Sequence, residues 1–80
     1  MDSTITFNKN GGTGGTDSTT ITHGTKQGSY PDISLPTMPG YNFIGYYDAA
    51  SGGTQYYNSS GQSVRDWDKT SDTTLYAHWF

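Results

Sequence analysis

The chain of 80 residues is long enough for one small domain. Only 30% of the residues are hydrophobic and half of these are aromatic, so a core has to be built from a few large rings rather than from Leu and Val. The formal net charge of −3 argues against a nucleic-acid partner and against binding to an anionic membrane, because both need a basic surface.

Two strands with a glycine-rich loop between them are predicted at the N-terminal end. In the stretch STITFNKN, residues 3–10, the apolar Ile5 and Phe7 alternate with threonines, which is the pattern of a half-buried strand. Residues 17–24, DSTTITHG, are rich in β-branched side chains and predict a second strand. We interpret NKNGGTGGT, residues 8–16, as a hairpin loop whose glycines supply positive φ angles and tolerate changes of length.

The same glycines raise the alternative of a phosphate-binding loop. Such a loop needs a Lys-Ser/Thr pair after its last glycine and the N-terminus of a helix facing the anion. Here Thr16 and Asp17 follow instead, and the carboxylate of Asp17 would repel a phosphate. Lys9 precedes the glycines, where we expect it to be badly placed to reach round them. The sequence therefore favours the hairpin loop.

The middle of the chain, TKQGSYPDISLPTMPG, is punctuated by prolines at positions 31, 36 and 39. Proline lacks a backbone N–H and restricts φ, so a regular helix is excluded and a central strand is disfavoured. We expect an extended crossing segment in which Tyr30, Ile33 and Leu35 dip into the core.

Three further strands and one candidate helix complete the chain. Residues 41–48, YNFIGYYD, predict the clearest strand, with Gly45 marking a bulge. A short strand is predicted at Gln55–Asn58. Residues 63–72, SVRDWDKTSD, are the one candidate for a helix, of one or two turns. Residues 73–80, TTLYAHWF, predict a closing strand. Alternation puts three of its side chains on one face: Leu75, Ala77 and Trp79.

These elements predict an α+β fold that is mainly β, with an antiparallel or mixed sheet and at most one short helix. We expect the core to be built around four rings: Phe7, Phe43, Trp67 and Trp79. The chain begins and ends on strand patterns, so we expect it to be a module cut from a longer protein.

Four stretches follow one another in a recognisable order: ITFNKNGGTGG, THGTKQGSYPDI, PGYNFIGYYD and TTLYAHW. Together they resemble the Listeria–Bacteroides repeat family, also known as the internalin B-type B repeat. The resemblance runs from about Ile5 to Trp79, and its most specific part is Gly-Tyr-x-Phe-x-Gly followed by Leu-Tyr-Ala-x-Trp. Tyr46 and His23 depart from the family pattern, which has Trp and Tyr at these positions.

The resemblance implies a small β-grasp-like fold, related in shape to ubiquitin and SUMO, with residues 1–80 as a single repeat module. It also implies a non-catalytic role as spacer and protein–protein interaction domain in tandem arrays on secreted or surface-anchored bacterial proteins, in a setting of adhesion and the cell wall. The implied partners are neighbouring repeats or other proteins. The family offers no catalytic or cofactor-binding residues to carry over.

Few residues suggest a chemical site. His23 and His78 are the only histidines and cysteine is absent, whereas zinc needs three or four ligands. The aspartates of DWDKTSD, residues 66–72, lack the glycine and the distal Glu of a calcium loop, and we interpret them as a solvated turn. Nothing marks a nucleophile, so we expect neither an enzyme nor a cofactor. No apolar run approaches the ~18 residues of a membrane span, so we expect no membrane insertion.

The tyrosines leave the function open between two classes. The chain has seven of them, more than we expect one small core to bury, and consecutive tyrosines on a strand point to opposite faces. The predicted interaction surface consists of five residues: Tyr46, Tyr56, Tyr57, Tyr76 and His78. Exposed rings suit contact with proteins or, as the alternative, a small carbohydrate-binding module in which Tyr and Trp stack on glycans. The plainest interpretation is that most of the rings simply cover the sheet.

Overall fold

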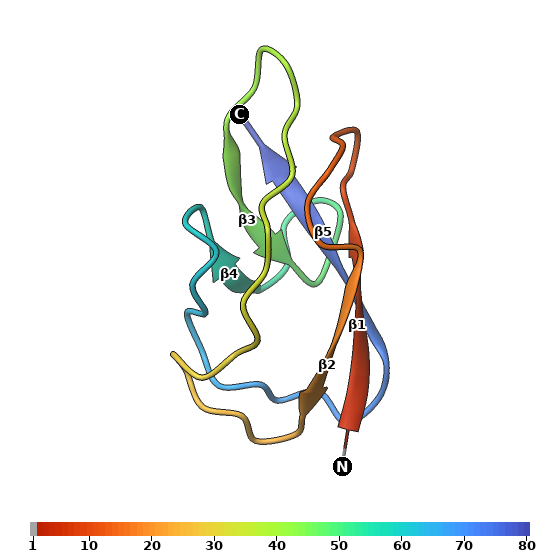
Figure 1. The fold of residues 1–80 in the computed structure, drawn as a ribbon, viewed down its shortest axis with the longest axis vertical. Coiled ribbons are helices and arrows are strands. Elements are labelled where there is room, and N and C mark those ends of the chain that lie inside the picture. Colours follow the sequence, from red (N-terminus) through yellow and green to blue (C-terminus); the bar gives the residue numbers. More distant parts are fainter. Residues whose placement is uncertain (1) are drawn as a thin grey trace.

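The computed structural model describes residues 2–80, which form a curled five-stranded sheet (Figure 1). The strands are β1 (Asp2–Asn8), β2 (Ser18–Thr22), β3 (Phe43–Tyr47), β4 (Gln55–Asn58) and β5 (Thr73–Trp79). Their order across the sheet is β2-β1-β5-β3-β4. The central pair, β1 and β5, is parallel, and the other three pairs are antiparallel. All five predicted strands are confirmed, and the sheet is mixed.

The short helix that the sequence allowed is not formed, and the described residues contain no helix. Ser63 instead makes an isolated bridge with Tyr57, and the N–H of Val64 donates to the carbonyl of Tyr56 (3.0 Å). Further along, the N–H of Trp67 donates to the carbonyl of Thr25 (2.8 Å). A helix of one or two turns is costly to nucleate, and here the backbone finds its partners in other parts of the chain. The fold is therefore mostly β rather than α+β.

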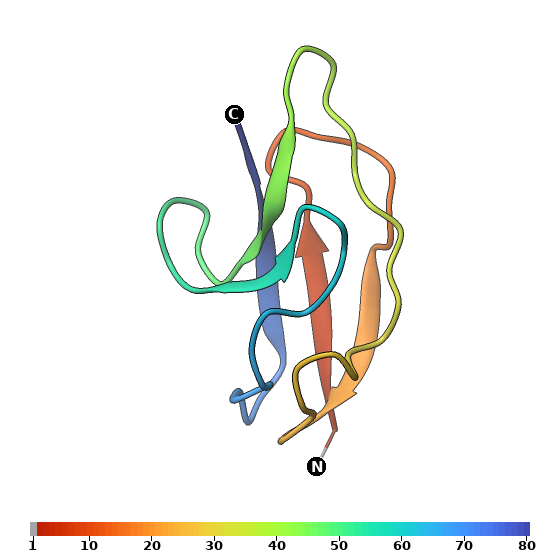
Figure 2. The same ribbon diagram turned by 90° about the vertical axis from the view of Figure 1, so that its left-hand side faces the viewer.

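The proline-rich stretch forms the predicted extended crossing segment. Figure 2 shows residues 30–40 running from one end of the sheet to the other. Thr13 and Thr37 exchange two backbone hydrogen bonds of 2.8 Å each, which fasten the segment to the glycine-rich loop. At the other end Tyr30 is buried, and the hydroxyl of Tyr57 donates to the carbonyl of Pro31 (3.0 Å). The segment thus covers part of the core.

The core is a cluster of aromatic rings with few aliphatic side chains. Its buried members are Ile5, Phe7, Ile21, Tyr30, Tyr46, Tyr56, Tyr57, Trp67, Leu75 and Ala77. Phe7 contacts Tyr46 with ring centroids 4.6 Å apart, and Tyr30 meets Tyr57 edge to face at 5.3 Å. Of the four rings predicted to build the core, Phe7 and Trp67 are buried, whereas Phe43 and Trp79 are partly buried and pack against its rim.

Gly45 marks the predicted bulge in β3. The register of β3 against β5 shifts between Phe43 and Gly45. Gly45 has a φ of 152°, and a Cβ atom at this position would overlap the carbonyl oxygen of Tyr57 on β4. Only glycine combines this backbone angle with so close an approach of the neighbouring strand.

Candidate functional site

The predicted interaction surface is only partly available. Tyr46, Tyr56 and Tyr57 are buried in the core, with exposed fractions of 0%, 1% and 0%. These three rings therefore do not form a surface, and their prediction as exposed contact residues is wrong. Tyr76 and His78 are half-buried and lie on the face of β5 opposite Leu75 and Ala77, as alternation predicted.

Tyr56 and Tyr57 are both buried because both faces of β4 are covered. Tyr57 packs on Tyr30, and Tyr56 packs on Trp67 with ring centroids 5.2 Å apart. The guanidinium of Arg65 also lies over the ring of Tyr56, 5.2 Å from its centroid. Residues 65–67 thus cover the Tyr56 side of β4. The alternation of side chains along β4 cannot reveal this cover, because it comes from another part of the chain.

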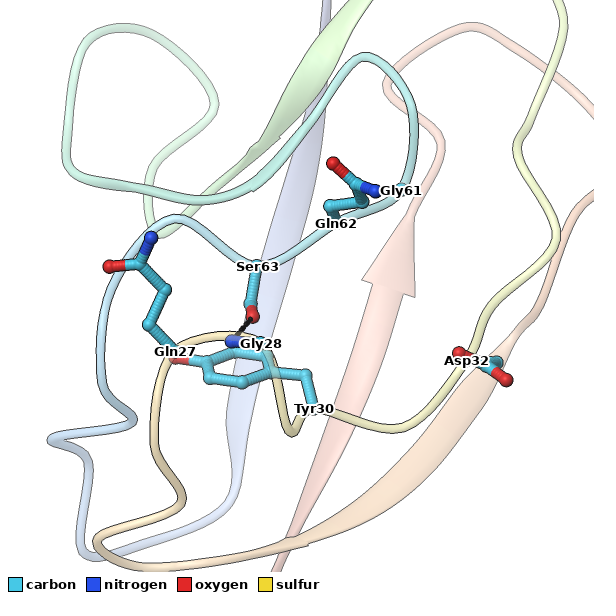
Figure 3. Close-up of a pocket in the computed structure, with 7 residues that line it drawn as sticks. All are labelled: Gln27, Gly28, Tyr30, Asp32, Gly61, Gln62 and Ser63. Carbon is cyan, nitrogen blue, oxygen red and sulfur yellow. Dashed lines mark hydrogen bonds between the residues drawn. The ribbon is translucent and has the colours of Figure 1, made fainter.

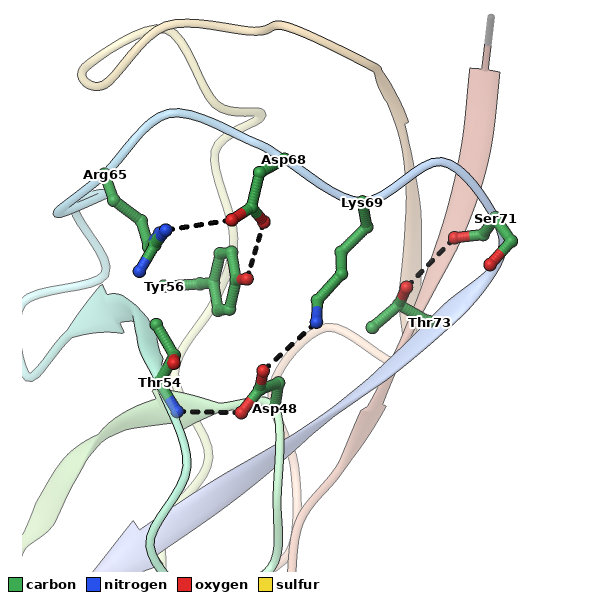
Figure 4. A network of polar contacts seen from close by, with 8 residues as sticks. All are labelled: Asp48, Thr54, Tyr56, Arg65, Asp68, Lys69, Ser71 and Thr73. Carbon is green, nitrogen blue, oxygen red and sulfur yellow. Dashed lines mark hydrogen bonds and ion pairs between the residues drawn. The ribbon is translucent and has the colours of Figure 1, made fainter.

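Figure 4 shows the polar network that surrounds Tyr56. The Tyr56 hydroxyl donates to Asp68 (2.7 Å), and Asp68 also accepts from Arg65 (2.8 Å). The hydrogen bond from Tyr56 is the main reason why the pKa of Asp68 lies below its usual value. Asp48 accepts from the N–H of Thr54 (2.7 Å), which chiefly lowers its pKa, and it also pairs with Lys69 (3.1 Å).

The aspartates of residues 66–72 serve three separate parts of the fold. Asp66 accepts from the N–H of Gln27 (2.8 Å), and Asp72 accepts from the N–H of Thr4 (2.8 Å). Asp68 accepts from the hydroxyl of Tyr56, so each of the three carboxylates binds a different part of the chain. Within residues 2–80, no group of three or more His, Cys, Asp or Glu side chains is placed to hold a metal ion.

His78 has a structural contact. Its ring stacks on Tyr47 with centroids 3.8 Å apart and an angle of 6° between the planes. Its Nε2 lies 2.8 Å from the carbonyl oxygen of Ala49, and because a carbonyl can only accept, Nε2 carries the proton. His78 therefore anchors the loop after β3, and its stacked ring face is already occupied.

The glycine-rich loop is the predicted hairpin connection, but it is not a loose one. The indole N–H of Trp79 donates to the carbonyl of Lys9 (2.9 Å), and the amide of Asn10 donates to the carbonyl of Ala77 (3.0 Å). The ammonium of Lys9 crosses the loop to the carbonyl of Thr16 and to Asp17, both at 3.0 Å, so the expectation that Lys9 could not reach round the glycines is wrong. With Lys9 used in this way, the loop offers no free cation to a phosphate.

A polar pocket of about 690 Å³ opens between the turn after β2 and the turn after β4 (Figure 3). It is lined by Gln27, Gly28, Tyr30, Asp32, Gly61, Gln62 and Ser63. The Ser63 hydroxyl accepts from the N–H of Gly28 (2.6 Å) and joins the two turns. Two amides and one carboxylate can form hydrogen bonds here, but there is no histidine, lysine or arginine to act as an acid–base partner.

An apolar groove of about 420 Å³ lies at the end of the molecule where the chain terminates. We call it the C-terminal groove; its lining residues are Leu35, Pro36, Thr37, Met38, Pro39, Tyr41, Asn42, Phe43 and Trp79. Tyr41 is 57% exposed, and the neighbouring Phe80 is 72% exposed. These are the large hydrophobic side chains that residues 2–80 leave in solvent. Two backbone hydrogen bonds between Asn42 and Phe80, of 2.9 and 3.1 Å, hold the groove's rim.

The sequence signal for this groove was the concentration of prolines before the third strand. It predicted an extended segment, but the contact of that segment with Trp79 depends on tertiary packing.

The described residues contain no helix long and apolar enough to cross a membrane.

A family model, the Listeria-Bacteroides repeat domain, matches residues 4–78. The chain belongs to this family. Listeria-Bacteroides repeats are modules typical of bacterial extracellular surface proteins and are generally not catalytic. A comparison with curated proteins found no match.

Proposed function

We propose that this Listeria-Bacteroides repeat is a non-catalytic module of a bacterial protein that is secreted or anchored at the cell surface, where it spaces neighbouring domains and contacts other proteins. Its partners would be neighbouring repeats or separate proteins, in the context of adhesion at the cell wall. The spacer role is supported by the elongated shape, with a long axis of 38 Å, and by the two ends of the described chain, which lie towards opposite ends of that axis (Figure 1). Modules of this kind extend an array when they are joined end to end.

We further propose that the fold is of the β-grasp type, as in ubiquitin and SUMO. The support is the strand order β2-β1-β5-β3-β4 with its parallel central pair. In this interpretation the extended segment of residues 30–40 occupies the place of the crossover helix between the second and third strands.

The observation that carries the protein-contact role is the C-terminal groove. It combines apolar walls with exposed rings, which is the composition of the centre of a protein–protein interface. Two of its residues, Pro36 and Pro39, restrict the backbone, and the indole of Trp79 is fixed by its hydrogen bond to Lys9, so little flexibility is lost on binding. We therefore assign to the groove an extended protein segment with apolar side chains.

Glycan binding remains the second candidate. The polar pocket of Figure 3 has amide and carboxylate groups that suit sugar hydroxyls. However, its one ring, Tyr30, is buried and offers little face for stacking. The rings that the sequence suggested for stacking, Tyr56 and Tyr57 among them, lie in the core.

Photo-crosslinking in the intact parent protein at the bacterial surface tests the groove. With p-benzoylphenylalanine in place of Tyr41, we expect a crosslink to a protein segment that is lost on adding Pro39→Asp, which puts a charge in the groove. The matched change Ser59→Asp, on an exposed turn outside the groove, should leave the crosslink unchanged. A crosslinked product insensitive to Pro39→Asp contradicts the groove as the contact site, and a product with the mass of a glycan contradicts a protein segment as its occupant.

A further inference from the structure

The two edge strands of the sheet, β4 and β2, differ in whether another part of the chain bonds to their outer side. Beyond β4, residues 62–64 close the edge: the N–H of Val64 donates to Tyr56 (3.0 Å), and the N–H of Asn58 donates to Gln62 (2.8 Å). At the other edge, β2 pairs with β1 alone among the described strands. The crossing segment bonds to Thr13 and, through two hydrogen bonds of Ser34 (2.8 and 3.1 Å), to Thr16, but none of its hydrogen bonds in the described residues reaches β2. The sheet therefore has one closed edge and one open edge.

The register shows which backbone groups the open edge presents. The N–H of Phe7 in β1 donates to the carbonyl of Asp17 (2.8 Å), the residue before β2. The odd-numbered residues of β2 therefore turn their backbone groups toward β1. In an antiparallel ladder the alternate residues then turn theirs outward. These are Ser18, Thr20 and Thr22, all of which are exposed. One of their groups is already used locally, because the carbonyl of Thr22 accepts from the N–H of Thr25 (3.0 Å).

β2 also lacks most of the devices that usually protect an edge strand. Its sequence, STTIT, contains neither lysine nor proline, and its register against β1 runs without a bulge. Edge strands in soluble proteins commonly carry one of these features, because an open row of N–H and C=O groups is a template for another strand. Threonine is also among the residues that pair well across strands.

We propose that β2 is a docking edge for a second copy of this chain, with the two β2 strands antiparallel about a two-fold axis at Thr20. This pairing joins the two five-stranded sheets into one. In this register Ser18 lies opposite the partner's Thr22, and Asp17 lies opposite the partner's His23. The Asp17 side chain is 98% exposed although it pairs with Lys9, and His23 is exposed, so a carboxylate faces an imidazole N–H at each end.

Sedimentation equilibrium of the 80-residue chain between about 10 μM and about 1 mM tests the proposal. We expect a monomer–dimer equilibrium that Thr20→Val preserves. Thr20→Lys should weaken dimerisation at least about fivefold, because it places two ammonium groups directly opposite each other. Ser59→Lys makes the same charge change on an exposed turn away from β2 and should have no effect. A chain that stays monomeric, or equal effects of the two lysine variants, overturns the proposal.

A charge exchange tests the register. Asp17→Lys and His23→Asp should each weaken the dimer, because like charges or unmatched groups then face each other across the axis. The double variant restores an opposite-charge pair at both ends and should recover the association. A dimer that the double variant does not restore overturns the pairing about Thr20. Amide NMR spectra of the monomeric variants verify that each remains folded.

Discussion

Gly12 gives the sharpest test of how the glycine-rich loop contributes to stability. A Cβ atom at this position would overlap Cζ2 of Trp79 and lie 2.9 Å from the carbonyl oxygen of Thr37. Carbon atoms ordinarily keep about 3.5–4.0 Å apart, so Gly12→Ala requires the indole or the loop to move. The indole cannot retreat freely, because its N–H donates to the carbonyl of Lys9 (2.9 Å).

The expected loss of stability has two parts. Overpacking a well-packed contact costs about 1–3 kcal/mol, and a weakened hydrogen bond adds about 1 kcal/mol. We therefore expect Gly12→Ala to lower the free energy of unfolding by about 2–4 kcal/mol. A domain of 80 residues has roughly 4–12 kcal/mol in total, so the loss is a large fraction of its stability.

Urea denaturation monitored by tryptophan fluorescence measures this loss, with Gly14→Ala as the matched control. Gly14 has a φ of 74°, but a methyl group attached there would meet no atom within 4 Å, so this control pays only the left-handed backbone cost of about 1–2 kcal/mol. In a Trp79→Leu background the cost of Gly12→Ala should fall, because the indole is gone. If Gly12→Ala costs no more than Gly14→Ala, the packing argument is wrong.

Two further predictions concern the buried hydroxyls and the carboxylates. Tyr57→Phe removes the hydrogen bond to Pro31 and should lower the free energy of unfolding by about 0.5–1.5 kcal/mol in the same urea assay. Tyr46→Phe should be neutral or stabilising, because the Tyr46 hydroxyl is buried with no partner among residues 2–80. The pKa values of Asp48 and Asp68 lie below the usual 3.8, so the stability they contribute is present above that pH and is lost as the pH falls through their lowered values. Urea midpoints measured between pH 7 and pH 2 follow this loss, and Asp68→Asn should flatten the profile. Burial raises the pKa of Tyr46 to about 12, so the phenol ionises more readily in the unfolded chain, and the free energy of unfolding should fall as the pH rises from 10 towards 12.

The strands were predictable because each has a local pattern. In β1, Ile5 and Phe7 alternate with threonines, and a one-residue slip would expose both. In β5, the buried Leu75 and Ala77 alternate with half-buried residues in the same way. Gly45 was identifiable as a bulge because an isolated glycine within an aromatic strand has no packing role of its own. These features need no knowledge of distant parts of the chain.

The burial of the tyrosines was not predictable from such patterns. Tyr56 is covered because residues 65–67 return over β4 in place of the helix that the sequence allowed, and Tyr57 is covered by Tyr30. Composition held the clue: a chain with 30% hydrophobic residues has too little Leu and Val to exclude its tyrosines from the core. The loop contacts of Asn10 and Trp79 were equally hidden, because they join residues about 70 positions apart.

The two surfaces proposed for protein contacts are separable. The C-terminal groove is built by residues 35–43 and Trp79, whereas the outer edge of β2 is built by residues 18–22, and they share no residue. A module that contacts its neighbour at the end of its long axis can therefore still pair sideways through β2. The fold closes its β4 edge with backbone hydrogen bonds and buries most of its rings, so the places where it leaves an apolar groove and an unpaired strand are the places where a repeat can bind.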